Sequence, residues 1–561
     1  MKWICITRRM TRWVVALCLM LSMYCSPRPQ ADDAAIQLAD FITAFSSQNE
    51  YYGSNEVHDM AATTYAEELK TIKNQLTQLR AIDRTKLRGD DLIDWKFAES
   101  LLVGRELEYE KMQPWKKNPR VYMTFTRQLS NIIDKPGDNN KIDQIEKLLR
   151  VIPIQLANAA LQLEVYVPRF QELSVFMAEN GRLLFNNQLP DFIEVNGAQA
   201  AHLAPLADEA RKALDTFLVF LQEELPKRPA GDFALGEVTY NEMLKGQFLL
   251  DYDAESLWSY GWDRFNATVK ELEEVANTID PQKTWQELAE EIKNEYPDKD
   301  KIIAAHQEWV DKAGEHIKSN NLIPIPWKER VYVVPRAAYL RKTSYYGNFS
   351  SAKGKDKDGF YTSQWMINPY EEQWDEKTKQ EYLVEHDWGV IIVTAPHETY
   401  GGHHVQGLYQ MHNPRPLRKS NGISIFSEGW GLYNETLMQE TGFLPDARIH
   451  LRQLQLRLWR NARVIYDVGM HTGRLSYEEA IRLMTDKVGF LRWAAQLEID
   501  SSTARPGYFI GYFMGMSEIL KMRDEYKQKM GDQFSLGSFH EKLLKTGNMP
   551  PALMREALFL N

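Results

Sequence analysis

Residues 396–406 have the sequence Pro-His-Glu-Thr-Tyr-Gly-Gly-His-His-Val-Gln and hold three of the chain's twelve histidines. Glu398 directly follows the first of them, His397, and two glycines precede His403 and His404. A catalytic zinc ion needs three protein ligands and one open position for water. A carboxylate beside the first ligand can take a proton from that water. The stretch therefore predicts a centre for metal binding and proton transfer.

The spacing of these histidines departs from the usual H-E-x-x-H arrangement, in which the two ligands lie one helical turn apart. His403 and His404 follow His397 by six and seven positions. On a regular helix this separates the Cα atoms by roughly 9–10 Å, too far for two imidazoles to bind one metal ion at about 2.0–2.1 Å each. A shared ion therefore requires a break in the helix, and Gly401–Gly402 is the natural place for it. Pro396 is expected in the first turn of a short helix, because it cannot donate a helical hydrogen bond.

Two further motifs follow this stretch. Residues 427–435 have the sequence Ser-Glu-Gly-Trp-Gly-Leu-Tyr-Asn-Glu, and residues 463–471 contain an Asp-x-Gly-x-His segment. Together with His-Glu-x-x-x-Gly-His-His-x-Gln, these motifs resemble the bacterial domain-of-unknown-function 885 family. They resemble, more distantly, helical zinc peptidases whose third ligand is a glutamate on a following helix. The typical family form has Pro-Gly where this chain has Gly401–Gly402. The resemblance covers much of residues 325–561, whereas the N-terminal half is similar only in being helical.

The resemblance implies a set of metal ligands and a catalytic base. Its ligands are His397, either His403 or His404, and Glu428, around one Zn²⁺ ion, with Glu398 as the general base. His403 is favoured because the glycine-histidine step is the more regular part of the family pattern, although the spacing leaves both histidines open. A His/Glu set of this kind also accepts manganese or cobalt.

The resemblance also suggests supporting residues. Glu435 lies seven positions after the glutamate ligand, on about the same helix face, where it would orient a ligand histidine or be an ordinary surface glutamate. His471 and Tyr512 are candidates to stabilise a developing oxyanion, although the glycine- and aromatic-rich run around Tyr512 also suits tight helix packing. Arg463 and Asp467 either orient these two residues or pair with each other.

The hydrophobic pattern predicts a mostly α fold. Apolar residues recur at helical spacing from residue 33 to about residue 320, and the pattern is helical again after residue 371. Between them lie β-branched and aromatic runs at Val331–Pro335, Ala338–Leu340, Thr343–Tyr346 and Phe360–Thr362. We expect a large helical, metallopeptidase-like body with a small β-sheet or hairpin element before the active-site helix. The expected regions are a leader (1–30), an N-terminal helical region (31–322) and a catalytic region (323–561).

The β element has two interpretations. A strand edge beside a hydrolytic site can hold an extended peptide by backbone pairing. The element can equally be a structural insert.

The N-terminus has the features of an export signal. Four basic residues within the first twelve are followed by an apolar run, Trp13–Cys25, that is short for a membrane span. All three cysteines lie in this leader, so the remaining chain holds no disulfide and no thiolate ligand or nucleophile. Cys25 stands where a bacterial lipoprotein carries its lipidated cysteine, but Ser22-Met23-Tyr24 is unlike the usual small-residue box, and cleavage near Ala31 is the alternative. We expect an exported protein, periplasmic or lipid-anchored to the cell envelope.

The net charge of −10 argues against a nucleic-acid partner, because phosphate binding needs a basic face. The resulting hypothesis is a zinc-dependent hydrolase, in the first place a peptidase acting on peptides or other small amides. Two alternatives stay open: a metallohydrolase of non-peptide amides or esters, and a non-catalytic exported binding protein. Glu398 argues against the second, since a pure binding site needs no base there.

Overall fold

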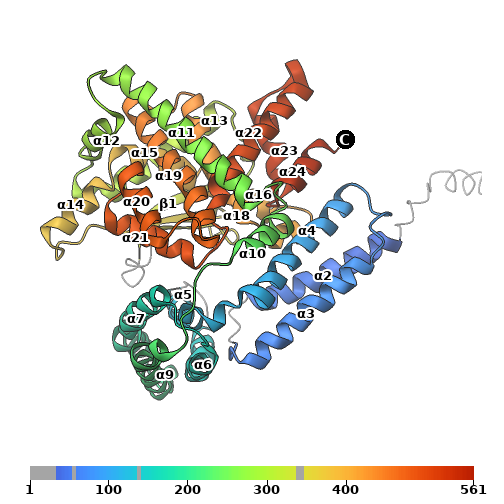
Figure 1. The fold of residues 1–561 in the computed structure, drawn as a ribbon, viewed down its shortest axis with the longest axis vertical. Coiled ribbons are helices and arrows are strands. Elements are labelled where there is room, and N and C mark those ends of the chain that lie inside the picture. Colours follow the sequence, from blue (N-terminus) through green and yellow to red (C-terminus); the bar gives the residue numbers. More distant parts are fainter. Residues whose placement is uncertain (1–32, 54–57, 135–139, 337–346, 561) are drawn as a thin grey trace, which may run out of the picture.

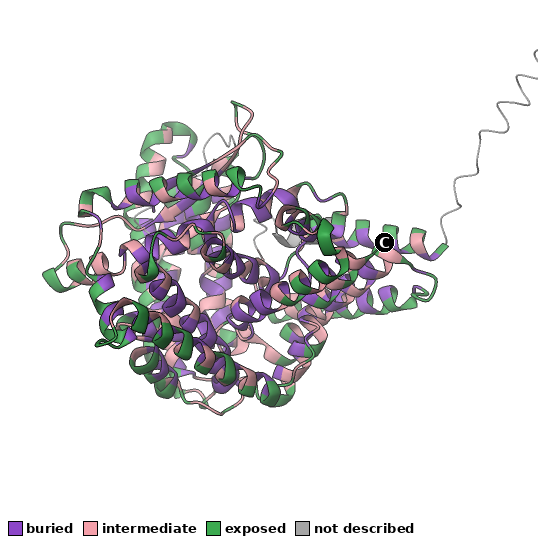
Figure 2. Cartoon of the chain, turned by 90° about the horizontal axis from the view of Figure 1, so that it is seen from above, coloured by how far each residue is buried: buried purple, intermediate pink, exposed green. Residues whose placement is uncertain are grey.

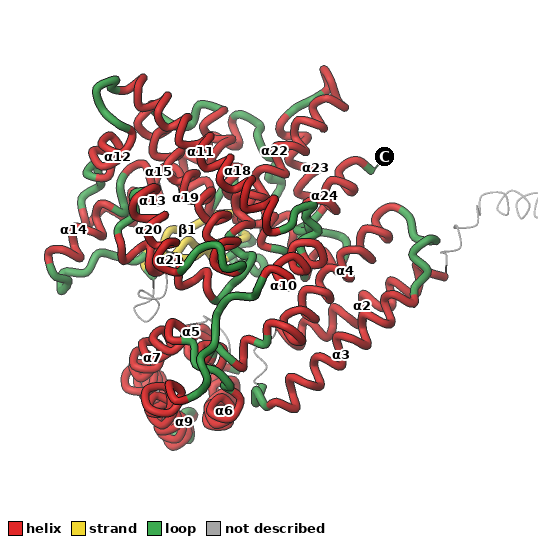
Figure 3. The backbone as a smooth tube through the Cα atoms, viewed as in Figure 1, coloured by secondary structure: helices red, strands yellow, loops and turns green. Residues whose placement is uncertain are grey.

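The computed structural model describes residues 33–53, 58–134, 140–336 and 347–560. Most of these residues are helical, and a single named sheet of three short strands accompanies the helices (Figure 3). The predicted mostly α class with a small β element is confirmed. The proposed leader and Cys25 lie outside the described residues.

The N-terminal helices form an elongated arm and a compact bundle (Figure 1). The arm consists of α2 (Asp33–Gly53), α3 (Ala62–Ala81) and α4 (Gly89–Leu107). The bundle consists of α5 (Phe125–Asp134), α6 (Lys141–Gln162), α7 (Pro168–Leu183), α8 (Leu189–Asn196) and α9 (Leu203–Val219). In α6 the apolar residues at helical spacing are buried in the bundle's own core, among them Ile145, Leu149 and Ile152. The apolar face of α6 therefore holds this helix in the bundle.

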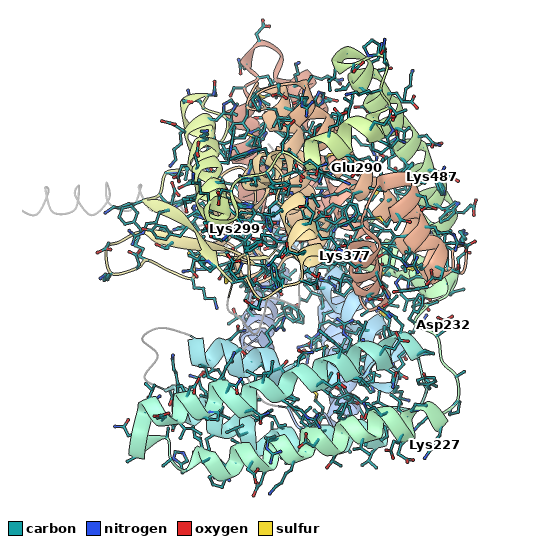
Figure 4. The ribbon with its side chains drawn as sticks, turned by 90° about the vertical axis from the view of Figure 1, so that its left-hand side faces the viewer. Lys227, Asp232, Glu290, Lys299, Lys377 and Lys487 are labelled. Carbon is teal, nitrogen blue, oxygen red and sulfur yellow. The ribbon has the colours of Figure 1, made fainter. Side chains whose placement is uncertain are left out.

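The remaining helices build the body. Before the sheet these are α10 (Glu237–Glu242), α11 (Ala254–Ile279), α12 (Trp285–Lys293) and α13 (Ile302–Ser319). After it follow α14 (Glu376–Val384), α15 (Trp388–Glu398), α16 (His403–Met411), α17 (Pro416–Ser420), α18 (Ser424–Glu440), α19 (Ala447–His471), α20 (Tyr477–Arg482), α21 (Arg492–Thr503), α22 (Ile510–Met530), α23 (Leu536–Thr546) and α24 (Pro551–Phe559). Figure 4 shows the bundle below this body, with Lys227 at the bundle's end and Asp232 on the segment that leads back to the body.

Helix α19 is the centre of the body, because it is buried on nearly all sides. Helix α11 packs along it, and Gly261 allows the approach: a Cβ there would lie 3.1 Å from the side chain of Val464. Helices α18 and α22 approach more closely still. A Cβ on Gly429 would lie 2.4 Å from the Cα of Gly515, so only glycine fits at this crossing. Figure 2 shows the outcome, with buried residues facing inward and exposed residues on the outer faces of the helices.

The sheet is mixed and is not a hairpin pair. Its strands are β1 (Glu329–Pro335), β2 (Asn348–Ser350) and β3 (Tyr361–Ile367), in the order β1-β3-β2. Strands β1 and β3 are parallel, and β2 pairs antiparallel with β3, so β2 lies at an edge. Buried residues of β1 and β3 pack with α13 and α15 in one small core. The predicted strands within residues 338–346 lie outside the described residues.

In the parts of the chain that the structure describes, none of the helices combines the length and apolar character needed to cross a membrane.

Candidate metal centre

Helix α15 places His397 and Glu398 in its last turn. Asp387 caps the start of the helix: its side chain accepts a hydrogen bond from the Val390 N–H and forms an ion pair at 2.8 Å with Arg452 of α19. Its apolar residues are buried, so the helix is fixed along its length. The expectation for Pro396 was wrong: it lies in the last turn of α15, because the buried apolar run before it continues as helix.

The predicted break at Gly401–Gly402 is present. Helix α15 ends at Glu398 and α16 begins at His403. The Gly402 N–H donates to the carbonyl of Pro396 at 2.8 Å, and a Cβ on Gly402 would lie 1.7 Å from the carbonyl oxygen of His397. The turn therefore folds back so tightly that only glycine fits. It brings the His397 and His403 rings to a centroid distance of 5.2 Å, with their planes nearly perpendicular.

Three carboxylate and imidazole groups meet at this turn. Ligand atoms of His397, Glu398 and His403 all lie within 4.8 Å of one another. Glu428, from the second turn of α18, faces the same two histidines: its Oε2 lies 3.5 Å from His403 Nε2 and 4.0 Å from His397 Nε2. These residues fit a divalent cation, because two imidazoles and one carboxylate are a common donor set for catalytic zinc.

The pKa shifts of His403 and Glu428 are also those expected at a site that binds a cation. Burial by itself would lower the pKa of His403, but the hydrogen bond and charge of Glu428 outweigh it and raise that pKa to about 9. Burial would raise the pKa of Glu428, but His403 lowers it to about 2. The pair is therefore an imidazolium beside a carboxylate, and a bound cation would replace the proton of His403 as the positive charge that faces Glu428.

Glu435 orients His397. Its Oε1 lies 2.8 Å from His397 Nδ1 and also accepts a hydrogen bond from Arg460 at 3.2 Å. A carboxylate only accepts, so Nδ1 donates and the lone pair of His397 lies on Nε2, the nitrogen that faces Glu428. A buried carboxylate behind a histidine is the usual outer-shell support of a metal ligand. The seven-residue spacing on α18 places Glu428 and Glu435 against the same imidazole.

His404 faces the sheet. Its Nδ1 lies 2.8 Å from the hydroxyl of Ser363 on β3, and its Nε2 lies 2.9 Å from Glu329 on β1. Both ring nitrogens are therefore engaged, and the residue ties α16 to the sheet. Of the two histidines left open by the spacing, His403 is the one that the structure turns towards Glu428.

Two tyrosines lie beside the centre, Tyr508 just before α22 and Tyr512 in its first turn. The Tyr508 hydroxyl donates to Glu428 Oε1 at 2.6 Å, which leaves Oε2 to face the histidines. The Tyr512 ring lies 6.3 Å from that of His397, and the guanidinium of Arg463 lies 3.9 Å from its centroid. Tyr508 was not among the residues expected at the site, yet it precedes Tyr512 by four positions, a helical spacing that could have indicated a shared face.

Arg463 and Asp467 do not pair with each other. Arg463 donates to Glu498 of α21 at 2.6 Å, and Tyr466 donates to the same carboxylate oxygen at 2.7 Å. Arg463 therefore reaches the centre only through the ring of Tyr512. Glu498 was missed by the sequence argument, because it lies outside every motif.

His471 and Asp467 hold a turn in place. His471 Nε2 lies 3.1 Å from the carbonyl of Ser502, and Asp467 accepts hydrogen bonds from the Tyr240 hydroxyl at 2.6 Å and the Gly507 N–H at 2.9 Å. Among the described residues that line the cavity next to the centre, neither of the two occurs. Both side chains are fully buried, and they fix the 502–507 segment that precedes Tyr508. The structure therefore gives no support for His471 as an oxyanion donor, since it has no access to that cavity.

A cavity of about 440 Å³ lies in front of the centre, and Glu398, His403 and Glu428 all face it. The edge strand β2 contributes Asn348 and Phe349. Four carboxamides occur in the lining: Asn348, Gln406, Gln410 and Asn548. The cavity thus combines two carboxylates with neutral groups that donate and accept hydrogen bonds.

The chain matches, over residues 45–558, the model of a family described as bacterial protein of unknown function (DUF885). A structure of a candidate lipoprotein of unknown function from Shewanella oneidensis superposes with a TM-score of 0.78 at 20% identity, covering 93% of this chain and 100% of that one. A candidate lipoprotein from Colwellia psychrerythraea gives a TM-score of 0.75 at 17% identity, covering 94% and 98%. At these identities the likeness shows the fold alone. Among curated proteins, none matches.

Proposed function

The chain belongs to the DUF885 family, whose function is unknown, and we propose from the site itself that it is a zinc-dependent hydrolase that cleaves peptides. One observation carries the proposal: His397, His403 and Glu428 converge from α15, α16 and α18, with Glu398 beside them. His397 Nε2, His403 and Glu428 would hold one zinc ion. Bound there, the ion would lower the pKa of a water molecule and polarise a carbonyl group.

Glu398 is the proposed general base. It precedes the turn, belongs to the same cluster as the two histidines and faces the cavity. Its carboxylate would take the proton of the attacking water and deliver it to the leaving amine. The alternative, Glu398 as the third ligand in place of Glu428, is less favourable. Glu428 has one oxygen held by Tyr508 and the other towards both histidines, the geometry of a fixed ligand.

Tyr512 is the proposed donor to the substrate's carbonyl oxygen, because the hydroxyl proton of Tyr508 is already donated to Glu428. Tyr508 and Tyr512 both line the cavity, and burial raises the pKa of each, so both hydroxyls stay protonated at neutral pH. A protonated hydroxyl fixed beside the reacting carbonyl stabilises the charge that develops on its oxygen.

A peptide is the favoured substrate because of β2. Among the described strands, β2 pairs on one side only, with β3, and it borders the cavity through Asn348 and Phe349. An extended peptide can add to such an edge through backbone hydrogen bonds, and the carboxamides of the lining suit main-chain amides. A non-peptide amide or ester would use the same water activation, so it is the second candidate.

The test combines metal analysis with a digest. The purified protein, free of its leader, is assayed for bound metal and incubated with a peptide library, and the products are identified by mass spectrometry. We expect about one zinc ion per chain and cleaved peptides. Glu398→Gln should keep the metal and lower turnover by roughly 10²–10⁴-fold. Turnover that survives this substitution contradicts the mechanism. Metal without peptide cleavage favours the other hydrolases, and no metal favours a binding protein.

We also propose that the protein is exported, either free in the periplasm or attached to the envelope through a lipid on Cys25. The leader supports export, and the two similar structures are described as candidate lipoproteins. Cell fractionation of the full chain and of Cys25→Ser tests the lipid. A protein that leaves the membrane fraction only in the variant supports it.

A further inference from the structure

Two carboxamides that line the cavity are held by one short segment of backbone. Gln410 lies near the end of α16, and Asn548 lies between α23 and α24. Gln410 Nε2 donates to the carbonyl of Asn421 at 2.9 Å. Asn548 Oδ1 accepts from the Ile423 N–H at 3.0 Å. Only Gly422 separates the two anchoring residues. Because consecutive Cα atoms lie about 3.8 Å apart, the anchors are within about 7.6 Å of each other, and the two carboxamides are neighbours.

The backbone bonds fix what each carboxamide still offers to a ligand. Gln410 turns its NH2 group to a carbonyl, so its oxygen, Oε1, remains. Asn548 turns its oxygen to an N–H, so its nitrogen, Nδ2, remains. Within the part of the chain that the structure describes, neither remaining atom makes a hydrogen bond, and neither is enclosed by protein. Asn548 is only 8% exposed and lines the cavity, so the cavity is where a ligand would reach it.

The segment between the anchors fixes the position of this pair. A Cβ on Gly422 would lie 2.5 Å from Asn548 Nδ2, so the amide packs directly against this glycine. Ile423 is the residue that precedes α18, the helix that brings Glu428 to the proposed metal centre. Asn548 is therefore anchored to the start of the same helix.

The pair lies at a defined distance from the proposed metal centre. His403 and Gln410 are seven positions apart on α16, so they lie on about the same face of the helix, and both line the cavity. Seven residues span roughly 10 Å of helix. An extended peptide covers this length with about three residues.

We propose that Gln410 and Asn548 form a subsite that binds an amide group of the peptide substrate, about three residues from the cleaved bond. An amide carries one acceptor and at least one donor, which match Asn548 Nδ2 and Gln410 Oε1. A carboxylate would face the oxygen of Gln410, and a hydrocarbon group would leave both atoms unpaired. The amide comes from an asparagine or glutamine side chain or from the substrate's main chain. The subsite rests on the proposed function for its substrate, but binding alone can test it.

The test measures peptide binding to the full mature chain carrying Glu398→Gln, so that bound peptides stay intact. The probes are fluorescent hexapeptides of alternating alanine and serine, capped at both ends, in which each position in turn carries glutamine, glutamate or methionine. Glutamate has the shape of glutamine without its NH2 group, and methionine has nearly that shape without its hydrogen bonds. We expect glutamine at one position to bind about tenfold more tightly than either replacement, because both lose hydrogen bonds to the pair.

Two variants assign the preference to this pair. Asn548→Asp keeps the oxygen that binds the Ile423 N–H but loses the donor. Gln410→Met loses the acceptor. Each should remove the preference for glutamine and leave binding of the methionine peptide unchanged. Thermal unfolding checks that both variants fold, and if one does not, the other decides.

The bundle offers matched controls outside the cavity. Asn118 Oδ1 accepts from the Arg120 N–H at 3.1 Å, and Gln171 Nε2 donates to the carbonyl of Leu221 at 3.1 Å. Asn118→Asp and Gln171→Met therefore make the same chemical changes at carboxamides with the same kind of backbone bond. Both should keep the preference for glutamine.

A second set of probes identifies the source of the amide. The main-chain nitrogen of the alanine-serine peptide is methylated at each position in turn, which removes the donor that would pair with Gln410 Oε1. A preference for glutamine assigns the amide to a side chain. If glutamine, glutamate and methionine bind alike, but one methylation weakens binding about tenfold and this loss disappears in Gln410→Met, the main chain is the source.

The subsite is overturned if neither pattern appears at any position, if no peptide binds, or if the control variants lose the preference as well. The peptidase proposal is decided separately, by turnover and metal content of the wild-type protein. Binding with the expected preference but without turnover would keep the subsite and reject the peptidase.

Discussion

The turn between α15 and α16 and the C-terminal end of α19 both carry histidines and acids at short spacing, yet their side chains behave differently. At the turn, His397 Nε2, His403 and Glu428 Oε2 face one another beside a cavity. At the end of α19, His471 Nε2 donates to a carbonyl, and Asp467 accepts from a hydroxyl and a backbone amide. A reactive centre needs polar groups that the fold leaves available to a ligand, whereas a structural centre uses its groups internally.

The largest expected effect separates the two centres directly. His403→Gln removes a proposed ligand, so bound zinc and turnover should both be lost, with activity falling on the order of 10³-fold or more. His471→Gln should keep the metal and near-normal turnover, at a loss of about 1–3 kcal/mol of stability from its buried hydrogen bond. Metal analysis, peptide turnover and urea unfolding of both variants check this. Loss of zinc from His471→Gln would contradict the structural role assigned to His471.

The turn itself can be tested through its glycine. Gly402→Ala places a Cβ 1.7 Å from the carbonyl oxygen of His397, so the two histidine-bearing helices must move apart. We expect roughly 3 kcal/mol of destabilisation from this overpacking, together with weaker zinc binding. Gly354→Ala is the control, because nothing lies within 4 Å of the added Cβ. Thermal unfolding of the two proteins should differ clearly, and equal stabilities would contradict the tight turn.

A smaller effect is expected at Glu435, which accepts a hydrogen bond from the proposed ligand His397. Glu435→Gln keeps the size of the side chain but weakens its hold on His397 Nδ1. Zinc affinity should fall roughly 10–100-fold, as is typical for such supporting carboxylates. A chelator-competition titration measures this. An unchanged affinity would reduce Glu435 to the role of a partner for Arg460.

The smallest effect concerns the metal-free protein and its pH dependence. The folded pKa of His403, about 9, lies above its ordinary value of 6.5. The stability from its pairing with Glu428 is therefore fully present below pH 6.5 and is lost as the pH rises through about 9. A shift of this size corresponds to roughly 3 kcal/mol, and screening by water in the cavity that His403 faces reduces the expected loss to roughly 1–2 kcal/mol. Unfolding of chelator-treated protein at several pH values measures it, and His403→Gln, which lacks the pair, should show no such slope.

Much of the proposed centre was open to prediction from the sequence. The adjacent His397 and Glu398 were indicated by residue type, because metal-ligand chemistry depends on it. Glu428 was named as a ligand through the family resemblance. The need for a break at Gly401–Gly402 followed from the helical rise alone. The helical class followed from the period of the apolar residues, which is a local property of the chain.

Other features depended on contacts between distant segments. His403 and His404 are neighbours in the sequence, and only the packing of α16 against the sheet turns one towards Glu428 and the other towards Glu329. The parallel pairing of β1 with β3 likewise cannot be predicted from the sequence of either strand alone, because register is set by the partner.

The sequence by itself thus determined which chemical groups are present and where the backbone must bend, because residue type and helical geometry act over a few positions. Only the tertiary structure decided which groups meet. It brought Tyr508 to Glu428 across 80 residues and assigned Asp467 to the turn at Gly507. The physical reason is that a side chain's role depends on which hydrogen-bond and charge partners lie next to it once the surrounding helices have packed.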